Sequence, residues 1–224
     1  MKKDDVKEAA VATIKGAVGI IPIAGGLLSE YIGLVQQKIA DKRTKEWVEK
    51  VEGKIEKLSC DIERLSNNEL FYSALHIATS KVMKEHQQEK IEYFANAIYN
   101  TVEIEDISEE KKIIFLTLLE KYTLSSIKLL KLFSENNHRD SDYVKNRGST
   151  IITTSPGQER LIKYITTYIK EFESEKELAK NLTTQLFNDG LLEEINFEMP
   201  EYPDRCRRKR TTSLGDEFLQ FITD

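Results

Sequence analysis

Apolar residues recur every three to four positions through the first two thirds of the chain, which is the period of an amphipathic α-helix. The clearest case is a heptad-like stripe with Lys and Glu on the remaining faces, formed by Val48, Val51, Ile55, Leu58, Ile62 and Leu65. This stripe predicts one long helix over about residues 29–66, which begins after Gly25 and Gly26 and ends at the sequence Ser-Asn-Asn.

The same period predicts four further helices before residue 136. Their expected starts are Glu69, about Gln87, the position after an N-cap at Ser108, and Thr123 or Ser125. Because the connections between these helices are short, we expect consecutive helices to be antiparallel neighbours. The sequence therefore predicts an all-α, multi-helix bundle over residues 1–136.

The apolar period stops near residue 137, and we expect residues 137–157 to form a linker. Two more helices are predicted after it, the second of which ends where Gly190 supplies a left-handed cap. Ile195, Phe197 and Met199 then alternate like a strand, and a basic loop, a last strand and a last helix follow. This order predicts a winged-helix-like module with a small β-hairpin over residues 158–224.

Residues 9–28 differ from the rest of the chain because they form an apolar, glycine-rich stretch with little charge. A glycine inside a helix costs about 1 kcal/mol relative to alanine, so another interaction has to compensate. One alternative is close packing, in which Ala12 and Gly16 let two backbones approach and a hairpin leads into the long helix. The residues assigned to this hinge and packing role are Gly16, Gly19, Pro22, Gly25 and Gly26.

The other alternative for this stretch is conditional insertion into a membrane. Lys15 and Pro22 argue against a constitutive transmembrane helix, and Asp4, Asp5 and Glu8 argue against a secretory signal peptide. Periodicity does not separate packing from insertion. The residues expected to meet a membrane are Ile14, Val18, Ile20, Ile21, Ile23, Leu27 and Leu28.

The distribution of charge leaves one segment that could bind a polyanion such as nucleic acid. The formal net charge of −5 argues against general coating of nucleic acid. The single dense basic run is made of Arg205, Arg207, Arg208, Lys209 and Arg210. Such a run can bind phosphate on DNA or on anionic lipid, but it is also typical of a solvated turn, and the sequence leaves both interpretations open.

Catalytic and metal-binding patterns do not occur in the sequence. His76, His86 and His138 do not have the spacing of a zinc pair, and no phosphate-binding or nucleophile motif is found. Cys60 and Cys206 match no metal or redox spacing, which favours a reducing cytoplasm. We therefore expect a cytoplasmic protein that is not an enzyme and holds no cofactor and no metal.

Residues 20–58, 69–100, 114–133 and 210–222 resemble a widespread family of uncharacterised bacterial cytoplasmic proteins. The glycine-rich apolar helix ahead of a long amphipathic helix is similar to the HeLo-like four-helix executioner domains of cell-death proteins. The C-terminal part resembles the winged-helix ends of abortive-infection proteins of the Abi-alpha type. These resemblances imply a role in antiviral defence and transfer no catalytic residue.

The leading hypothesis is a bacterial abortive-infection effector that perturbs the inner membrane through its apolar N-terminal segment after forming a homo-oligomer. One alternative is a winged-helix regulator that binds nucleic acid through the basic run. Another is a scaffold that binds a partner protein through the heptad stripe.

Overall fold

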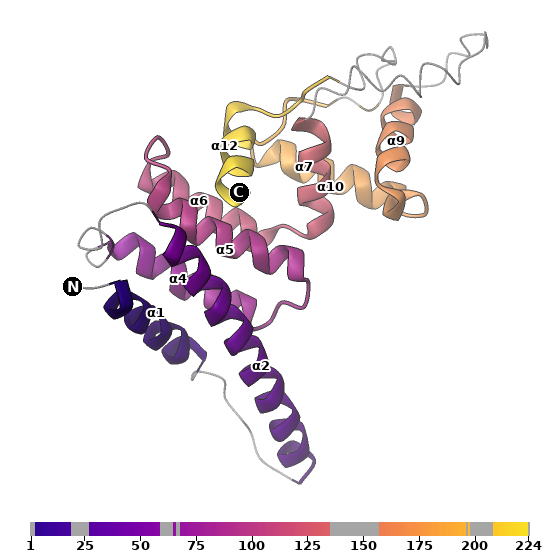
Figure 1. Ribbon diagram of the computed structural model, residues 1–224. Coiled ribbons are helices and arrows are strands. Elements are labelled where there is room, and N and C mark those ends of the chain that lie inside the picture. Colours follow the sequence, from indigo (N-terminus) through magenta and orange to yellow (C-terminus); the bar gives the residue numbers. More distant parts are fainter. Residues whose placement is uncertain are drawn as a thin grey trace. The chain divides into compact units, whose positions relative to one another are not determined.

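The computed structural model describes most of the chain (Figure 1). The described residues are 3–18, 27–58, 65, 68–134, 157–195, 197 and 208–223. These ranges contain nine α-helices and one short 3-10 helix, and their β structure is limited to one isolated bridge. The all-α prediction is confirmed for this part of the chain. The chain divides into two compact units, Met1–Lys121 with Gln220–Asp224, and Tyr122–Leu219.

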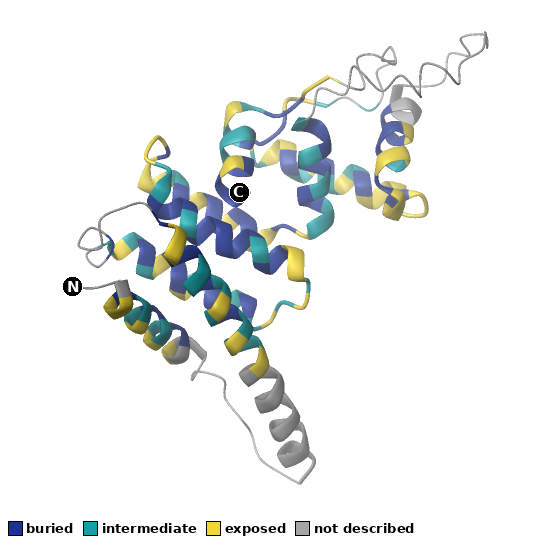
Figure 2. Ribbon diagram, in the orientation of Figure 1, coloured by how far each residue is buried: buried dark blue, intermediate teal, exposed yellow. Residues whose placement is uncertain are grey.

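The first unit is built from five helices and the end of a sixth. They are α1 (Lys3–Val18), α2 (Leu27–Lys57), α4 (Glu69–Val82), α5 (Gln88–Glu103), α6 (Glu109–Lys121) and the end of α12 (Ser213–Ile222). α5 packs against α2, α4 and α6, and α1 packs against α2 and α4. Buried residues follow one another along most of α5 (Figure 2), so this helix forms the centre of the first unit's core.

Trp47 fixes α2 in this core. Its side chain is 1% exposed, and its Nε1 donates a hydrogen bond of 2.9 Å to Thr79 Oγ1 on α4. Val51, Ile55 and Leu58 of the predicted stripe are buried as well. Because these positions are covered by the chain itself, they offer no free apolar seam to the partner protein that the scaffold alternative requires.

α2 ends at Lys57, earlier than the predicted residue 66. The amide of Leu58 donates to the carbonyl of Ile55 at 3.2 Å, an i→i−3 bond that tightens the last turn of a helix. Residues 59–64, which include the stripe position Ile62, lie outside the described residues. The period of the stripe continues past Lys57, but period alone does not show where a helix stops.

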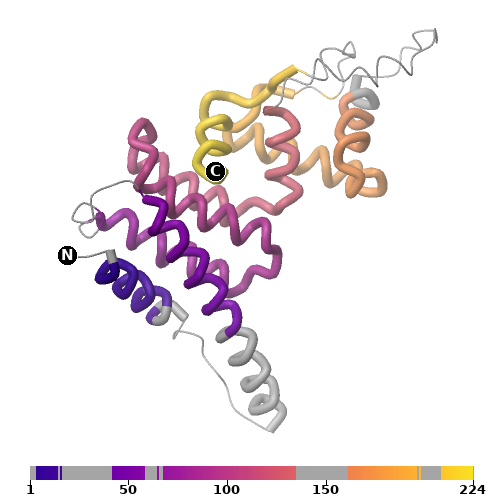
Figure 3. The backbone as a smooth tube through the Cα atoms, in the orientation of Figure 1, coloured from indigo at the N-terminus to yellow at the C-terminus, as the bar shows by residue number. Residues whose placement is uncertain are grey.

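The second unit contains three further α-helices, a 3-10 helix and the beginning of α12. They are α7 (Leu124–Ser134), α9 (Gly157–Tyr168), η1 (Lys170–Phe172) and α10 (Lys176–Asn188), and Figure 3 traces the chain through them. α7 packs against α9 and α10, so the structure groups it with this unit, whereas the sequence assigned it to the bundle. The expected linker lies outside the described residues except for Gly157.

Ser108 caps α6 as predicted, and Thr123, predicted as one of two possible helix starts, caps α7. Ser108 Oγ accepts the amide of Lys111 at 3.4 Å, and Thr123 Oγ1 accepts the amide of Ser126 at 3.2 Å. Both bonds satisfy an amide that has no partner within its own helix. α6 and α7 therefore begin one residue after these caps, at Glu109 and Leu124.

α10 ends at the predicted glycine. Gly190 has φ 76°, its amide donates to the carbonyl of Phe187 at 2.8 Å, and the amide of Leu191 donates to the carbonyl of Leu186 at 3.0 Å. These two bonds form a Schellman motif, which favours glycine because an L side chain is strained at that φ.

The small β-hairpin is not shown. Leu192 and Thr211 form one antiparallel bridge, and within the described residues neither Ile195 nor Phe197 belongs to a strand. Met199, with the rest of residues 198–207, lies outside them. The winged-helix prediction therefore rests on the order of helices and on this bridge.

Tyr122 ties the start of the second unit to the end of α10. Its side chain is 1% exposed, and its hydroxyl donates to Asp189 Oδ2 at 2.7 Å. Burial, reinforced by the hydrogen bond to Asp189, raises the pKa of Tyr122 above its usual range, so the hydroxyl keeps its proton and acts as a donor at neutral pH.

We predict opposite effects for two glycine substitutions. A Cβ at Gly215 would lie 2.2 Å from the carbonyl oxygen of Leu191, so Gly215→Ala should lower the stability of the second unit by more than about 2 kcal/mol. A Cβ at Gly16 would meet nothing within 4 Å, so Gly16→Ala should stabilise α1 by up to about 1 kcal/mol. Hydrogen exchange of α10 and α1 measures both effects, and a harmless Gly215→Ala would contradict the close approach of the two segments.

Candidate functional site

The N-terminal helix packs on the bundle through a narrow stripe. Val6, Ala10 and Ile14 are 0%, 1% and 0% exposed and follow one another at the four-residue spacing of one helix face. Ile14, which the sequence assigned to a membrane surface, therefore lies in the core. The other six assigned residues are not described in this detail: Val18 ends α1, Leu27 and Leu28 begin α2, and Ile20, Ile21 and Ile23 lie outside the described residues.

The expected close packing at Ala12 and Gly16 is wrong. Both residues are exposed, and the space around Gly16 is open. The small residue at the helix contact is Ala10, which lies on the other side of α1. The remaining hinge residues, Gly19, Pro22, Gly25 and Gly26, lie outside the described residues.

The docking of α1 is modest in strength. Burial of a Val or Ile side chain contributes about 1.5–3 kcal/mol, so Val6 and Ile14 together give roughly 3–6 kcal/mol before the entropy of ordering the helix is subtracted. Lys7 Nζ also lies 2.6 Å from Glu56 Oε1 on α2. This hydrogen bond raises the pKa of Lys7, but an ion pair at the surface adds little to stability.

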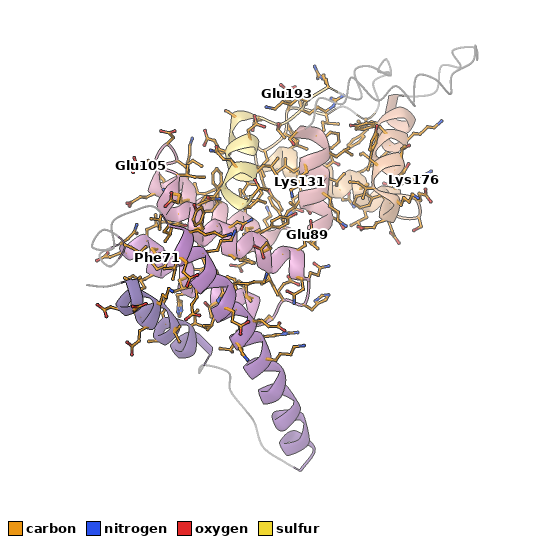
Figure 4. The ribbon with its side chains drawn as sticks, in the orientation of Figure 1. Phe71, Glu89, Glu105, Lys131, Lys176 and Glu193 are labelled. Carbon is orange, nitrogen blue, oxygen red and sulfur yellow. The ribbon has the colours of Figure 1, made fainter. Side chains whose placement is uncertain are left out.

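Figure 4 draws the side chains and labels Phe71 on α4, which is fully buried. α4 lies between α1 and α5, since it packs against both. Among the described helices none combines the length and the apolar composition that crossing a membrane requires.

The basic run does not form a uniform cationic patch. Arg208 Nη2 lies 3.7 Å from Glu193 Oε2, and Lys209 Nζ lies 2.5 Å from Asp216 Oδ2, so both described exposed cations face a carboxylate. Arg205 and Arg207 lie outside the described residues.

The prediction that Arg210 binds phosphate or an anionic surface is wrong. Its side chain is 1% exposed and therefore unavailable to phosphate. Its amide donates to the carbonyl of Phe133 at 2.8 Å, and its carbonyl accepts the amide of Glu193 at 2.8 Å. The backbone at this position is held on both sides, beside the bridge residue Thr211. The residue therefore stabilises the second unit.

α10 exposes polar side chains together with the apolar Leu178 and Phe187. The exposed side chains include Glu177, Asn181, Thr184 and Asn188, without the row of cations that most DNA-reading helices carry. Together with the carboxylates that face Arg208 and Lys209, this surface weakens the nucleic-acid alternative.

α5 carries a buried pair of asparagines that was not predicted from the sequence. Asn96 and Asn100 are 4% and 6% exposed and stand four residues apart, so both lie on one side of the helix. Asn100 Nδ2 donates to the carbonyls of Phe221 and Thr223 at 3.0 and 2.9 Å, and Asn96 Nδ2 donates to that of Ile222 at 3.2 Å. Two asparagines at helical spacing inside an apolar stretch were the signal that could have revealed this pair.

The described part of the chain shows no arrangement for metal chemistry. No group of three or more potential metal ligands occurs among its residues. An open depression of about 400 Å³ in the first unit is lined by Glu46, Glu49, Lys50 and Gln88. Lys50 Nζ in this depression lies 2.5 Å from Glu92 Oε2 and is therefore engaged in an ion pair.

Comparison with known proteins gives no protein-family model that matches the chain, and no match among the curated proteins or the solved structures. The resemblance to Abi-alpha-type and HeLo-like proteins stays a prediction. The proposals below rest on the residues of this chain.

We predict that the two neighbouring arginines differ in role. Arg210→Ala should lower the stability of the second unit by more than about 2 kcal/mol, because it removes a large buried side chain. Arg208→Ala is the matched control and should change stability by less than about 0.5 kcal/mol, since its ion pair is exposed. Urea unfolding monitored by near-ultraviolet circular dichroism compares them, and equal losses would mean that Arg210 is not a core residue.

Proposed function

We propose that this chain is a non-enzymatic effector of bacterial antiviral defence that perturbs the inner membrane through residues 11–28. The observation that carries the proposal is the docking of α1 by the stripe of Val6, Ala10 and Ile14. In this proposal the stripe is narrow enough to open, and while it is closed it keeps Ile14 of the apolar segment buried. In this proposal the resting protein is cytoplasmic, and a homo-oligomer forms when α1 leaves the bundle.

The chemistry of the segment supports the proposal. From Gly16 to Leu28 the sequence contains no charged residue, and an apolar segment partitions into the membrane interface in proportion to its apolar area. Its sequence is rich in glycine, which lowers the intrinsic preference of a segment for a single backbone conformation. Undocking would also expose the apolar side chains on which α1 packs, which favours association between copies.

We further propose that the second unit is a winged-helix-like module. Three helices in the order α7, α9 and α10 precede the bridge between Leu192 and Thr211, and α12 follows. This order supports a module for interaction with a partner molecule. If that partner were nucleic acid, binding would weaken steeply with salt, because phosphate contacts release counterions.

The membrane proposal predicts a gain and a loss of function from two single charges. Val6→Asp places a charge in the docking stripe but outside the apolar segment, so it should undock α1 and depolarise expressing bacteria faster than the wild type. Ile20→Asp places a charge inside the segment, where membrane insertion costs about 2.5–3.5 kcal/mol more, so it should abolish depolarisation. A potential-sensitive dye measures both effects at matched expression.

The double variant decides between membrane action and simple unfolding. Val6→Asp with Ile20→Asp should be undocked but inactive, and Glu8→Ala, an exposed change on α1, should behave as the wild type. If the double variant depolarises cells as strongly as Val6→Asp alone, the apolar segment is not the active element and the proposal is wrong.

A further inference from the structure

The end of α12 is held inside the first unit by side-chain amides. Asn100 Nδ2 donates to the carbonyls of Gln220, Phe221 and Thr223 at 3.3, 3.0 and 2.9 Å. Asn96 Nδ2 donates to the carbonyl of Ile222 at 3.2 Å. The last carbonyls of a helix have no partner within it. The side-chain amides of α5 therefore cap the end of α12.

Apolar contacts accompany this cap. Phe221 and Ile222 are both 0% exposed, and the ring of Phe221 lies 5.6 Å from that of Phe115 on α6. Residues 220–223, here called the C-terminal latch, therefore cover part of α5 and α6. The rest of α12 belongs to the second unit, so the division of the chain falls within one helix.

One polar group at the latch contact has no hydrogen-bond partner. Asn96 Oδ1 is buried, and among the described residues no donor lies within hydrogen-bonding distance of it. An unsatisfied buried acceptor costs free energy that is regained when water reaches it. Release of the latch therefore lets water donate to Asn96 Oδ1, while it breaks the hydrogen bonds from Asn100 and the one from Asn96 Nδ2 to Ile222.

The latch and α1 lie at the two ends of a continuous series of packed helices. The latch is bonded to α5, α5 packs against α4, and α4 packs against α1. Protein cores are close-packed, so a change in one packed layer is transmitted to the next.

We propose that the C-terminal latch is an autoinhibitory contact that keeps α1 docked. When residues 220–223 leave Asn96 and Asn100, water enters the exposed side of α5, the α4–α5 contact loosens and α1 separates more often. This coupling is a property of the first unit alone. Where the proposed membrane function holds, release of the latch is the step that precedes it.

The test measures how often α1 opens, without any membrane. Ala10→Cys is placed in a chain whose Cys60 and Cys206 are replaced by serine, because position 10 is 1% exposed and reacts with a thiol reagent only when α1 separates. Asn100→Ala, and separately a chain that ends at Leu219, should raise the labelling rate about tenfold, as expected for the loss of a buried hydrogen-bonded contact. Far-ultraviolet circular dichroism should stay unchanged for Asn100→Ala.

Two control variants separate coupling from general destabilisation. Tyr122→Phe removes the buried hydrogen bond to Asp189 in the second unit and should label at the unaltered rate. Asn96→Leu removes the unsatisfied acceptor together with one long hydrogen bond, so it should label no faster than the parent chain.

Equal labelling of the parent chain, Asn100→Ala and the chain that ends at Leu219 would overturn the latch. A rise for Tyr122→Phe as large as that for Asn100→Ala would also overturn it, because the effect would then be general. Faster labelling without depolarisation in the bacterial experiment would leave the latch in place and reject the membrane function, so the two proposals fail separately.

Discussion

The burial of α5 on nearly all sides determines the arrangement of the first unit. Its buried positions include not only apolar residues but also Lys90, Asn96, Asn100 and Thr101. An unpaired polar group in such a place costs about 1–3 kcal/mol, so the surrounding elements have to supply partners. The carbonyls of the latch accept from both asparagines, and Lys112 Nζ on α6 donates to the carbonyl of Thr101 at 2.9 Å.

α1 stands in contrast to α5. It buries Val6, Ala10 and Ile14 against the bundle and exposes Ala12 and Gly16 on its other side, so among its described residues only three small or medium side chains are fully buried. The hydrophobic free energy of such a contact is a fraction of that of α5, because it grows with the apolar area removed from water. A helix bound this way is suited to leave the bundle while the bundle remains folded, as elements of low local stability do.

Local chemistry made three of the helix boundaries predictable. Ser108, Thr123 and Gly190 act within a few residues of themselves, so the sequence places them correctly. Assigning α7 to the second unit required knowledge of its partners α9 and α10, which are distant in sequence. Most of the expected hinge and the outer basic residues lie outside the described residues and stay predictions.

The candidate site was harder to predict because it depends on which way side chains face. α1 is so rich in alanine that its two faces differ little in hydrophobicity, so the sequence does not distinguish the face with Ala12 and Gly16 from the buried stripe that contains Ala10 and Ile14. Arg210 belongs to a run of like charges, yet its backbone is fixed between Phe133 and Glu193 and its side chain is buried. The sequence predicts the charge of such a residue but not its orientation.

Native-state hydrogen exchange tests the central claim that α1 separates from a bundle that stays folded. The account predicts that the buried amides of α1 exchange through a local opening at least about 2 kcal/mol lower in free energy than the opening of α5, and that denaturant has little effect on the α1 opening. If α1 and α5 exchange together, with the same free energy and the same denaturant dependence, α1 is an integral part of the core and the account is contradicted.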